Sequence, residues 1–260
     1  MMGMNTTIRT SCQSGYRFRA AIALLTIALA VSSPSQSSAE QHWSYSGEDG
    51  PQQWGNLAAD YLMCSMGRNQ SPIDLFGAVD ANLEELVLDY PNRGIVGEVN
   101  NGHTIQENLK PGNFITIQGQ KFEAKQFHFH SPSEHRIDGK SFPLEVHVVH
   151  ANPEGQLAVL GVMFDEGEEN SMLNQLNGFR PTGLPPYTGP VDYNLLITSL
   201  DEYYAYNGSL TTPPCSEGVV WIVLKHPVTA SRKQIDRFHD AMGADTNRPI
   251  QPRNARTILE

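Results

Sequence analysis

The chain is poor in several features, and each scarcity bears on what the protein can be. Only 18 of its 260 residues are lysine or arginine, against 28 aspartates and glutamates, so its net charge is −10 at pH 7. An acidic chain repels the phosphates of a nucleic acid, and we expect no nucleic-acid partner. Long segments with a helical apolar period are also few, whereas glycine (22) and proline (17) are abundant. This composition favours a turn-rich β architecture.

Long apolar runs are scarce as well, and the most extended one spans residues 20–31. Two arginines precede it and a serine-rich tract ending at Ala39 follows it, which is the pattern of a secretory signal peptide. A spanning helix needs roughly 20 apolar residues, so a membrane anchor is the weaker alternative. We expect residues 1–39 to be removed, which leaves residues 40–260 as one periplasmic or secreted domain outside the membrane.

Cysteine is scarce too, with three residues in the chain. Cys12 would leave with the signal, so Cys64 and Cys215 would remain in the exported domain. Two cysteines in an exported domain predict one disulfide bond, and two free thiols are the alternative. Such a bond would close a loop of about 150 residues and stabilise the fold by roughly 5 kcal/mol in the chain-entropy model.

The most informative stretch is residues 126–130, where two histidines alternate with two phenylalanines. In a β-strand, residues two apart point to the same face, so His128 and His130 would share one face and Phe127 and Phe129 the other. Two imidazoles on a rigid strand can chelate a metal. Taken alone, the pair is weak evidence, because most such histidines are ordinary core or surface residues.

A second strand-like segment, residues 144–150, supplies a third candidate ligand. The period of two places Glu145, His147 and Val149 on one face and His150 on the other. His147 is therefore the better ligand, and His150 is interpreted as structural. Three neutral imidazoles with an open fourth position describe a catalytic zinc site, in contrast to a closed structural one.

Other segments can be placed along the chain by their pattern. We expect strands at Leu86–Leu88, Ile95–Val99, Phe114–Ile117, Gln120–His130, Leu144–His150, Gln156–Met163 and Val219–Leu224. Helices are predicted at Asn56–Tyr61 and Glu168–Asn177. A third helix is predicted at Ser231–Met242, with Ser231 as its N-cap and Gly243 as its stop.

Several further motifs surround the two histidine-bearing strands: Gln70–Asp74, Asn100–His103, Ser133–His135 and Ser209–Cys215. Together these segments resemble the α-class carbonic anhydrases, and the resemblance runs from about Trp43 to Arg256. It implies one domain of the mainly β (α+β) class with a large, twisted, mostly antiparallel sheet of about ten strands and short peripheral helices. It also implies zinc at the base of a conical cleft.

The resemblance implies that Zn²⁺, held by His128, His130 and His147, supports the reversible hydration of carbon dioxide to bicarbonate and a proton through attack by zinc hydroxide. It also implies that Gln126 supports His128 and that Glu145 supports His147 at the ring nitrogen that does not bind the metal. The period of two agrees, since both residues fall on the ligand face. A solvated surface charge is the alternative for Glu145.

Three more residues receive catalytic roles from the resemblance alone. Thr211 matches the residue that accepts a hydrogen bond from the zinc-bound hydroxide, and Glu134 matches the acceptor of that threonine's proton. His103 matches the proton shuttle, and a histidine that titrates near neutrality suits this task. An ordinary turn residue is the alternative for His103. Cys64 and Cys215 match positions that are bridged in exported members.

The substrate pocket is also implied by the resemblance. An apolar wall for carbon dioxide would be formed by Val149, Val159, Leu210, Val219 and Trp221, for which ordinary core packing is the alternative. The chain would act as a monomer or homodimer. Two rival functions remain: a metal-free relative of the same fold that only binds, and a periplasmic zinc carrier. The binding relatives typically lack a metal-binding histidine, and carriers add His-rich or acidic tracts; neither feature occurs here.

Overall fold

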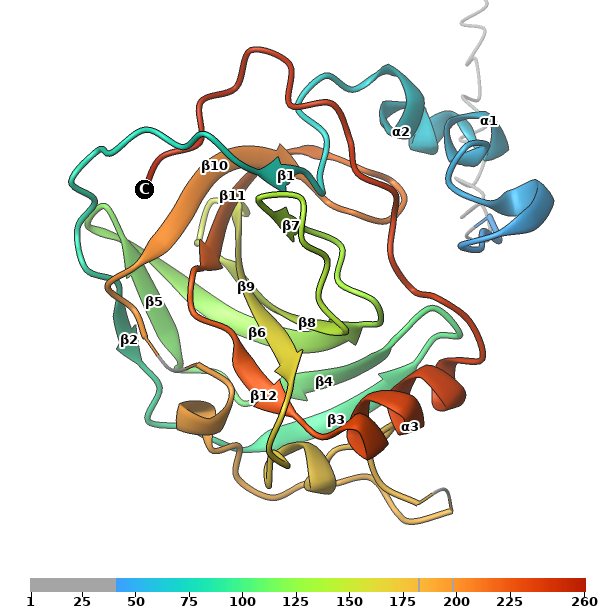
Figure 1. Cartoon of the computed structure of the whole chain (residues 1–260), viewed down its shortest axis with the longest axis vertical. Coiled ribbons are helices and arrows are strands. Elements are labelled where there is room, and N and C mark those ends of the chain that lie inside the picture. The colour runs from blue at the N-terminus through green and yellow to red at the C-terminus, as the bar shows by residue number, and fades with distance from the viewer. Residues whose placement is uncertain (1–40, 182, 198) are drawn as a thin grey trace, which may run out of the picture. The chain divides into compact units, whose positions relative to one another are not determined.

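The computed structural model describes residues 41–181, 183–197 and 199–260, so the predicted signal peptide, residues 1–39, lies outside the described residues. Its centre is a ten-stranded sheet with the order β10-β11-β9-β8-β6-β4-β3, in which β12 also pairs with β9, and β5 joins β2 to β6 (Figure 1). Most neighbouring strands run antiparallel, whereas β9 is parallel to both β11 and β12. The predicted mainly β fold with a large, mostly antiparallel sheet is confirmed.

The strands of this sheet are β2 (Val87–Asp89), β3 (Ile95–Asn100), β4 (Ile105–Leu109), β5 (Phe114–Ile117), β6 (Gln120–His130), β8 (Leu144–Ala151), β9 (Leu157–Glu166), β10 (Tyr203–Ser209), β11 (Glu217–Leu224) and β12 (Val228–Ala230). A separate parallel pair comprises β1 (Asp74–Leu75) and β7 (Arg136–Ile137). The helices are short: α1 (Trp54–Leu57), α2 (Met63–Met66), α3 (Arg232–Met242), and the 3-10 turns η1 (Gly47–Asp49), η2 (Ala59–Tyr61), η3 (Leu173–Gln175) and η4 (Tyr193–Leu195). None of the described helices is both long and apolar enough to cross a membrane.

The C-terminal helix α3 forms where its sequence signals predict it. Ser231 and Gln234 make a reciprocal capping box, in which each side chain accepts from the other's backbone N–H. Gly243 ends the helix in the left-handed conformation, with φ of 72°, which glycine adopts without steric cost. Ile235 and Phe238 are buried from this helix into the main core. The predicted start and stop of this helix are confirmed.

The helix predicted over Glu168–Asn177 is wrong, because the structure has only the single turn η3 there. Asn170 explains the difference, since its side chain accepts from the backbone N–H groups of Met172 and Leu173 and donates to the carbonyl of Leu195. Such local side-chain bonds offer the backbone an alternative to helical pairing. The predicted helix Asn56–Tyr61 is likewise divided into α1 and η2 by Ala58, whose backbone is extended (φ −151°, ψ 153°).

The sequence pattern did not predict strands β4 and β10. Strand β4 alternates as expected for a sheet, but its inward positions include the charged Glu107 between Ile105 and Leu109. A charge at a buried position hides the apolar alternation on which strand prediction relies. Strand β10 contains a glycine and polar residues among its tyrosines, which weakens the same signal.

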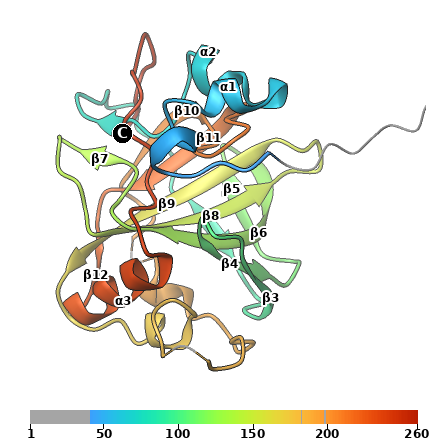
Figure 2. The ribbon, with the colours of Figure 1, turned by 90° about the vertical axis from the view of Figure 1, so that its right-hand side faces the viewer.

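Strands β6 and β8 present two different faces, and this division positions the site. We call the side that carries His128, His130 and His147 the cleft face. The opposite side, which carries Phe127, Phe129, Val146 and Val148, is the core face and belongs to the main hydrophobic cluster. Helix α3 packs on the core face, and Figure 2 shows α3 and the segment with α1 and α2 on opposite sides of the sheet.

Candidate metal centre

Sheet register brings the three predicted ligand histidines together. His128 on β6 lies directly opposite His147 on β8 in the antiparallel pairing, and His130 follows two residues later on the same face. The ring centroids are 5.1 Å apart for His128 and His130, 5.4 Å for His128 and His147, and 4.6 Å for His130 and His147. One nitrogen from each ring lies within 4.8 Å of the other two.

Neighbouring oxygens hold the Nδ1 atoms of the first two histidines. His128 Nδ1 lies 2.8 Å from Gln126 Oε1, and His130 Nδ1 lies 2.5 Å from the backbone carbonyl of Thr246. An oxygen that only accepts requires a proton on Nδ1, which leaves the Nε2 lone pair of each ring free to bind a metal. Gln126 therefore occupies the place that the sequence predicted for it.

Glu145 holds the third histidine through its other nitrogen. Its Oε1 atom lies 2.8 Å from His147 Nε2, so His147 presents Nδ1 to the site. The same carboxylate accepts from His135 Nδ1 and from the backbone N–H groups of Glu134 and His135, all within 2.9 Å. It is fully buried, so the prediction of a buried supporting carboxylate, and not a solvated charge, agrees with the structure. His135, Glu145 and His147 also lie close enough to hold an ion, but the atoms facing one another are already engaged in these hydrogen bonds.

The surroundings of these histidines favour neutral imidazoles at two of the three positions. Burial, together with the other two histidines, holds the pKa of His128 well below its usual range. Burial is also the largest cause of the lowered pKa of His130. Burial would lower the pKa of His147 too, but Glu145 outweighs it and the pKa is raised. A metal would therefore compete with a proton mainly at His147.

Two buried atoms beside the histidines have no hydrogen-bond partner among the described residues: His130 Nε2 and Glu134 Oε2. They lie 3.6 Å apart, and Glu134 Oε2 is also 3.9 Å from His147 Nδ1. The other oxygen of Glu134 accepts from the backbone N–H of Arg248 at 2.8 Å. Because a buried nitrogen lone pair without a partner is costly, its presence amid converging imidazoles fits a metal-binding donor set.

A cavity of about 150 Å³ opens above the three histidines. It is lined by Trp43, Tyr45, Asn101, His103, Thr104, Gln106, Gln126, His128, His130, His147, Val149, Val159, Leu210, Thr211, Thr212 and Trp221. Four of the five predicted wall residues are among them. Val219 does not line the cavity and packs beside Val159 and Trp221 in the adjoining hydrophobic cluster.

Thr211 lies at the cavity wall in the loop between β10 and β11. The predicted disulfide bond is present between Cys64 and Cys215, with a sequence separation of 151, and Cys215 N donates to the carbonyl of Thr212. The bond therefore ties this loop to helix α2. Thr211 is 6% exposed, and the hydrogen bond from its hydroxyl to Glu134 stays a prediction.

His103 lies at the rim of the same cavity. Its ring stacks on Trp43, with centroids 3.6 Å apart and planes inclined by 11°. The side chain of Asn101 accepts from the backbone N–H groups of His103 and Thr104, and this turn needs the positive φ of 81° at Gly102. The shuttle role of His103 remains a prediction.

Sequence reasoning missed several contributors to the site. Thr246 and Arg248 act through backbone atoms, so no side-chain pattern could have revealed them. Gln106 lies directly opposite His128 on β4, a strand that was not predicted. Its position opposite His128 would have indicated a place in the site, but the register of β4 against β6 could not be known from the sequence.

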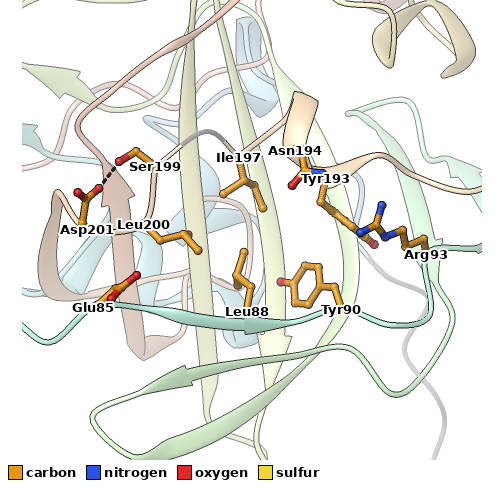
Figure 3. Close-up of a pocket in the computed structure, with 10 residues that line it drawn as sticks. All are labelled: Glu85, Leu88, Tyr90, Arg93, Tyr193, Asn194, Ile197, Ser199, Leu200 and Asp201. Atoms are coloured by element: carbon orange, nitrogen blue, oxygen red, sulfur yellow. Dashed lines mark hydrogen bonds between the residues drawn. The ribbon is translucent and has the colours of Figure 1, made fainter.

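A larger cavity, of about 610 Å³, lies elsewhere and contains none of the predicted site residues. Figure 3 shows Arg93 at one end of it and Glu85 and Asp201 at the other, with Leu88 and Leu200 between them. It lacks any converging set of metal ligands or nucleophiles among its described residues. The converging histidines line the smaller cavity.

Comparisons with known proteins agree with this geometry. A family model described as eukaryotic-type carbonic anhydrase matches residues 49–260. The carbonic anhydrase of Pectobacterium carotovorum is 45% identical over 240 residues, covering 90% of this chain and 98% of that protein. The carbonic anhydrase of Klebsiella pneumoniae is 46% identical over 224 residues, covering 84% and 91%.

The solved structure of α-carbonic anhydrase from Thermovibrio ammonificans, in complex with the inhibitor sulfanilamide, superposes with a TM-score of 0.80 at 45% identity. That match covers 85% of this chain and 100% of the other. The sheet, the three converging histidines and these matches lead to one conclusion: the chain belongs to the α-class, or eukaryotic-type, carbonic anhydrase family.

Proposed function

We propose that this chain catalyses the reversible hydration of carbon dioxide to bicarbonate and a proton at a zinc ion held by His128, His130 and His147. It is a carbonic anhydrase by family, and its three histidines fit a zinc site. Three ring nitrogens converge, and the other nitrogen of each ring is already hydrogen-bonded; this arrangement carries the proposal. When bound, zinc supplies a Lewis acid that makes water a nucleophile at neutral pH.

The chain's own residues prepare the ligands. Gln126, the carbonyl of Thr246 and Glu145 each take one ring N–H, which selects the tautomer that turns a lone pair toward the site. Gln126 and Glu145 lie on strands of the sheet, and Thr246 is hydrogen-bonded to Ser131, so the ligand rings need little reorganisation on binding.

Glu134 and Thr211 orient the reaction in this proposal. Glu134 is buried, and its Oε1 accepts a hydrogen bond from the backbone N–H of Arg248. Its Oε2 therefore remains to accept a hydrogen bond from the Thr211 hydroxyl. A threonine that donates to Glu134 can then only accept from the nucleophile, which aims a nucleophile lone pair at the substrate carbon.

The apolar wall suits a small neutral substrate. Val149, Val159, Leu210 and Trp221 line the cavity, and Val219 supports them from the cluster behind. Carbon dioxide has no strong hydrogen-bonding group, so an apolar wall next to the histidines concentrates it without competing polar contacts. Bicarbonate is charged and polar, and it gains nothing from that wall.

His103 moves the product proton in this proposal. The histidine lies at the cavity rim, where a titratable ring can accept a proton through water and release it to solvent. Its stacking on Trp43 defines one resting position of the ring.

The domain division, the location and the oligomeric state of the chain complete the proposal. We place residues 1–39 as a signal peptide and residues 40–260 as the catalytic domain, in the periplasm or secreted. The disulfide bond between Cys64 and Cys215 supports an oxidising location. A monomer or a homodimer is compatible with a site that is complete within one chain.

Metal analysis of the purified protein tests the function directly. We expect close to one zinc per chain, carbon dioxide hydration that disappears on chelation, and recovery when zinc is restored. A protein that holds no zinc and hydrates no carbon dioxide would instead be a binding relative with the same fold. One that binds zinc tightly but never hydrates carbon dioxide would be a carrier.

A further inference from the structure

A string of buried polar groups continues from Glu145 away from the metal centre. His135 lies at its start, with Nδ1 2.7 Å from Glu145 Oε1 and Nε2 2.7 Å from the Tyr206 hydroxyl. The same hydroxyl lies 2.8 Å from Ser71 Oγ. Ser71 and His135 are fully buried, and Tyr206 is 5% exposed. None of these residues reaches the cavity or a predicted ligand nitrogen.

The donors in this string all point one way. The Glu145 carboxylate only accepts, so His135 donates from Nδ1 and, as a neutral ring, accepts at Nε2. The Tyr206 hydroxyl must then donate to His135, and its oxygen accepts from the Ser71 hydroxyl. Ser71 Oγ in turn accepts from the backbone N–H of Ser209 at 3.1 Å.

The Tyr206 hydroxyl satisfies Nε2 of His135 while Nδ1 donates to Glu145. Without that hydroxyl, the buried Nε2 lone pair has no donor, and the imidazole can answer this cost only by shifting its position or by moving its proton to Nε2. Either change weakens the hydrogen bond from His135 Nδ1 to Glu145. Glu145 would lose one of the four donors that hold it, and His147 depends on that carboxylate for its own orientation.

Packing leaves the rings little freedom to compensate. The Trp221 ring lies 4.7 Å from His135 and 4.8 Å from His147 between centroids, and it stacks with Tyr206 at an interplanar angle of 11°. Its own Nε1 donates to the carbonyl of Ser209 at 2.9 Å. Trp221 thus packs against His135, Tyr206 and the ligand His147, which restricts rotation of their rings. A change in the hydrogen bonds of the string is therefore passed on to His147.

We propose that Tyr206 and His135 are positioning residues for the metal centre, which hold Glu145 so that His147 keeps its ligand geometry and zinc is released slowly. The inference rests on the proposed zinc site. It assigns a task in metal retention to residues whose hydrogen bonds reach the ligand His147 only through Glu145.

The variant Tyr206→Phe removes one hydroxyl and nothing else. The matched control is Tyr203→Phe, on the same strand, where a buried tyrosine donates to the carbonyl of Glu84 far from the site. Zinc loss from the holoenzyme into excess chelator is timed for both variants. We expect roughly tenfold faster loss from Tyr206→Phe and wild-type kinetics, within twofold, from Tyr203→Phe.

A second series tests the path through His135. His135→Asn keeps a donor near Glu145 but cannot reach Tyr206, whereas His135→Ala keeps neither. Zinc loss should be slower from His135→Asn than from His135→Ala, and the visible spectrum of the cobalt-substituted protein should shift in the same order. The thermal stability of each metal-free protein is measured alongside.

The outcomes separate three situations. Equal zinc-loss rates for Tyr206→Phe and Tyr203→Phe, with similar losses of metal-free stability, would overturn the inference and leave a purely structural string. A wild-type protein that binds no zinc would overturn the proposed function instead. If Tyr206→Phe does not fold, Ser71→Ala removes the donor one step earlier, and wild-type zinc retention in that variant would count against the inference.

Discussion

Two buried glutamates on strands that flank β6 in one sheet have opposite surroundings. Glu145 on β8 points to the cleft face and accepts four hydrogen bonds. Glu107 on β4 points to the core face, is 1% exposed, and neither of its oxygens has a hydrogen-bond partner among the described residues. The two carboxyl groups are equally buried, but one accepts several hydrogen bonds and the other accepts none among the described residues.

Their acidities differ accordingly. Burial would raise the pKa of Glu145, but His135, His147 and the hydrogen bonds hold it well below its usual range. Burial, and then the nearby Glu98 carboxylate, raises the pKa of Glu107 to about 7, although Arg180 opposes the shift. The comparison shows that partners, more than burial, decide whether an interior carboxyl carries charge. The cleft face is built for charge, and the core face tolerates this carboxyl best as a neutral acid.

The largest expected effect separates two histidines of one strand. His147→Ala removes a cleft-face ligand, so zinc content and carbon dioxide hydration should both be lost. His150 lies on the core face beside Tyr90 and the carbonyl of Ala158, and burial lowers its pKa to about 4. His150→Ala should therefore lower thermal stability but leave a zinc-containing, active enzyme. Zinc retained in His147→Ala and lost in His150→Ala would break the division into two faces.

The next effect concerns Glu107 and depends on pH. Its pKa is raised on folding, so the folded state keeps a proton that the unfolded chain loses, and stability falls as pH rises from about 4.5 through 7. Glu107→Gln cannot ionise and should recover up to about 3 kcal/mol of unfolding free energy at pH 8. Near pH 4, where both states are protonated, the variant should gain little. Denaturant unfolding at the two pH values measures this.

Glu145→Gln is the matched substitution on the cleft face, and it should act with the opposite sign. The lowered pKa of Glu145 stabilises the fold above the pKa of the unfolded chain, and this stabilisation is lost as pH falls through the folded pKa. The amide also brings a donor against donors, so stability at pH 8 should drop. Similar effects from the two Gln variants would show that hydrogen bonding does not distinguish the two sites.

A smaller effect is expected at Thr211. Thr211→Ala should keep close to one zinc per chain while the hydration rate falls on the order of 100-fold, because the nucleophile remains but its orientation is lost. Glu134→Gln should behave alike, since it removes the acceptor of the same proton. Stopped-flow hydration with metal analysis tests this, and full activity in both variants would refute the assigned roles.

The smallest effect is expected at the rim of the cleft. His103→Ala should lower kcat on the order of tenfold in dilute buffer and leave kcat/KM nearly unchanged, because proton transfer follows the chemical step. Added imidazole should restore much of the loss. An unchanged kcat in dilute buffer would make His103 a turn residue that packs on Trp43.

Much of the site could be predicted because strand periodicity is local. Alternation alone placed His128 with His130 and separated His147 from His150, since successive side chains of a strand point to opposite faces. The cap and stop of α3 are equally local. The helix expected near Asn170 does not form, because the Asn170 side chain accepts from the backbone N–H of Met172 and donates to the carbonyl of Leu195. The backbone N–H of Asn170 also donates to the Gln234 side chain. The contacts with Leu195 and Gln234 are distant in the chain, and no local pattern contains them.

The sequence by itself determined which residue types share a face: the ligands, their supporting Gln126 and Glu145, and the aromatic residues behind them. Only the tertiary structure decided which nitrogen of each ring is free, because the partners of His130 and Glu134 are backbone atoms of Thr246 and Arg248, more than 100 residues away. It also decided the charge states of Glu145 and Glu107. The physical reason is common to both: hydrogen-bond partners and local polarity are properties of contacts, and these contacts join segments that are distant in the chain.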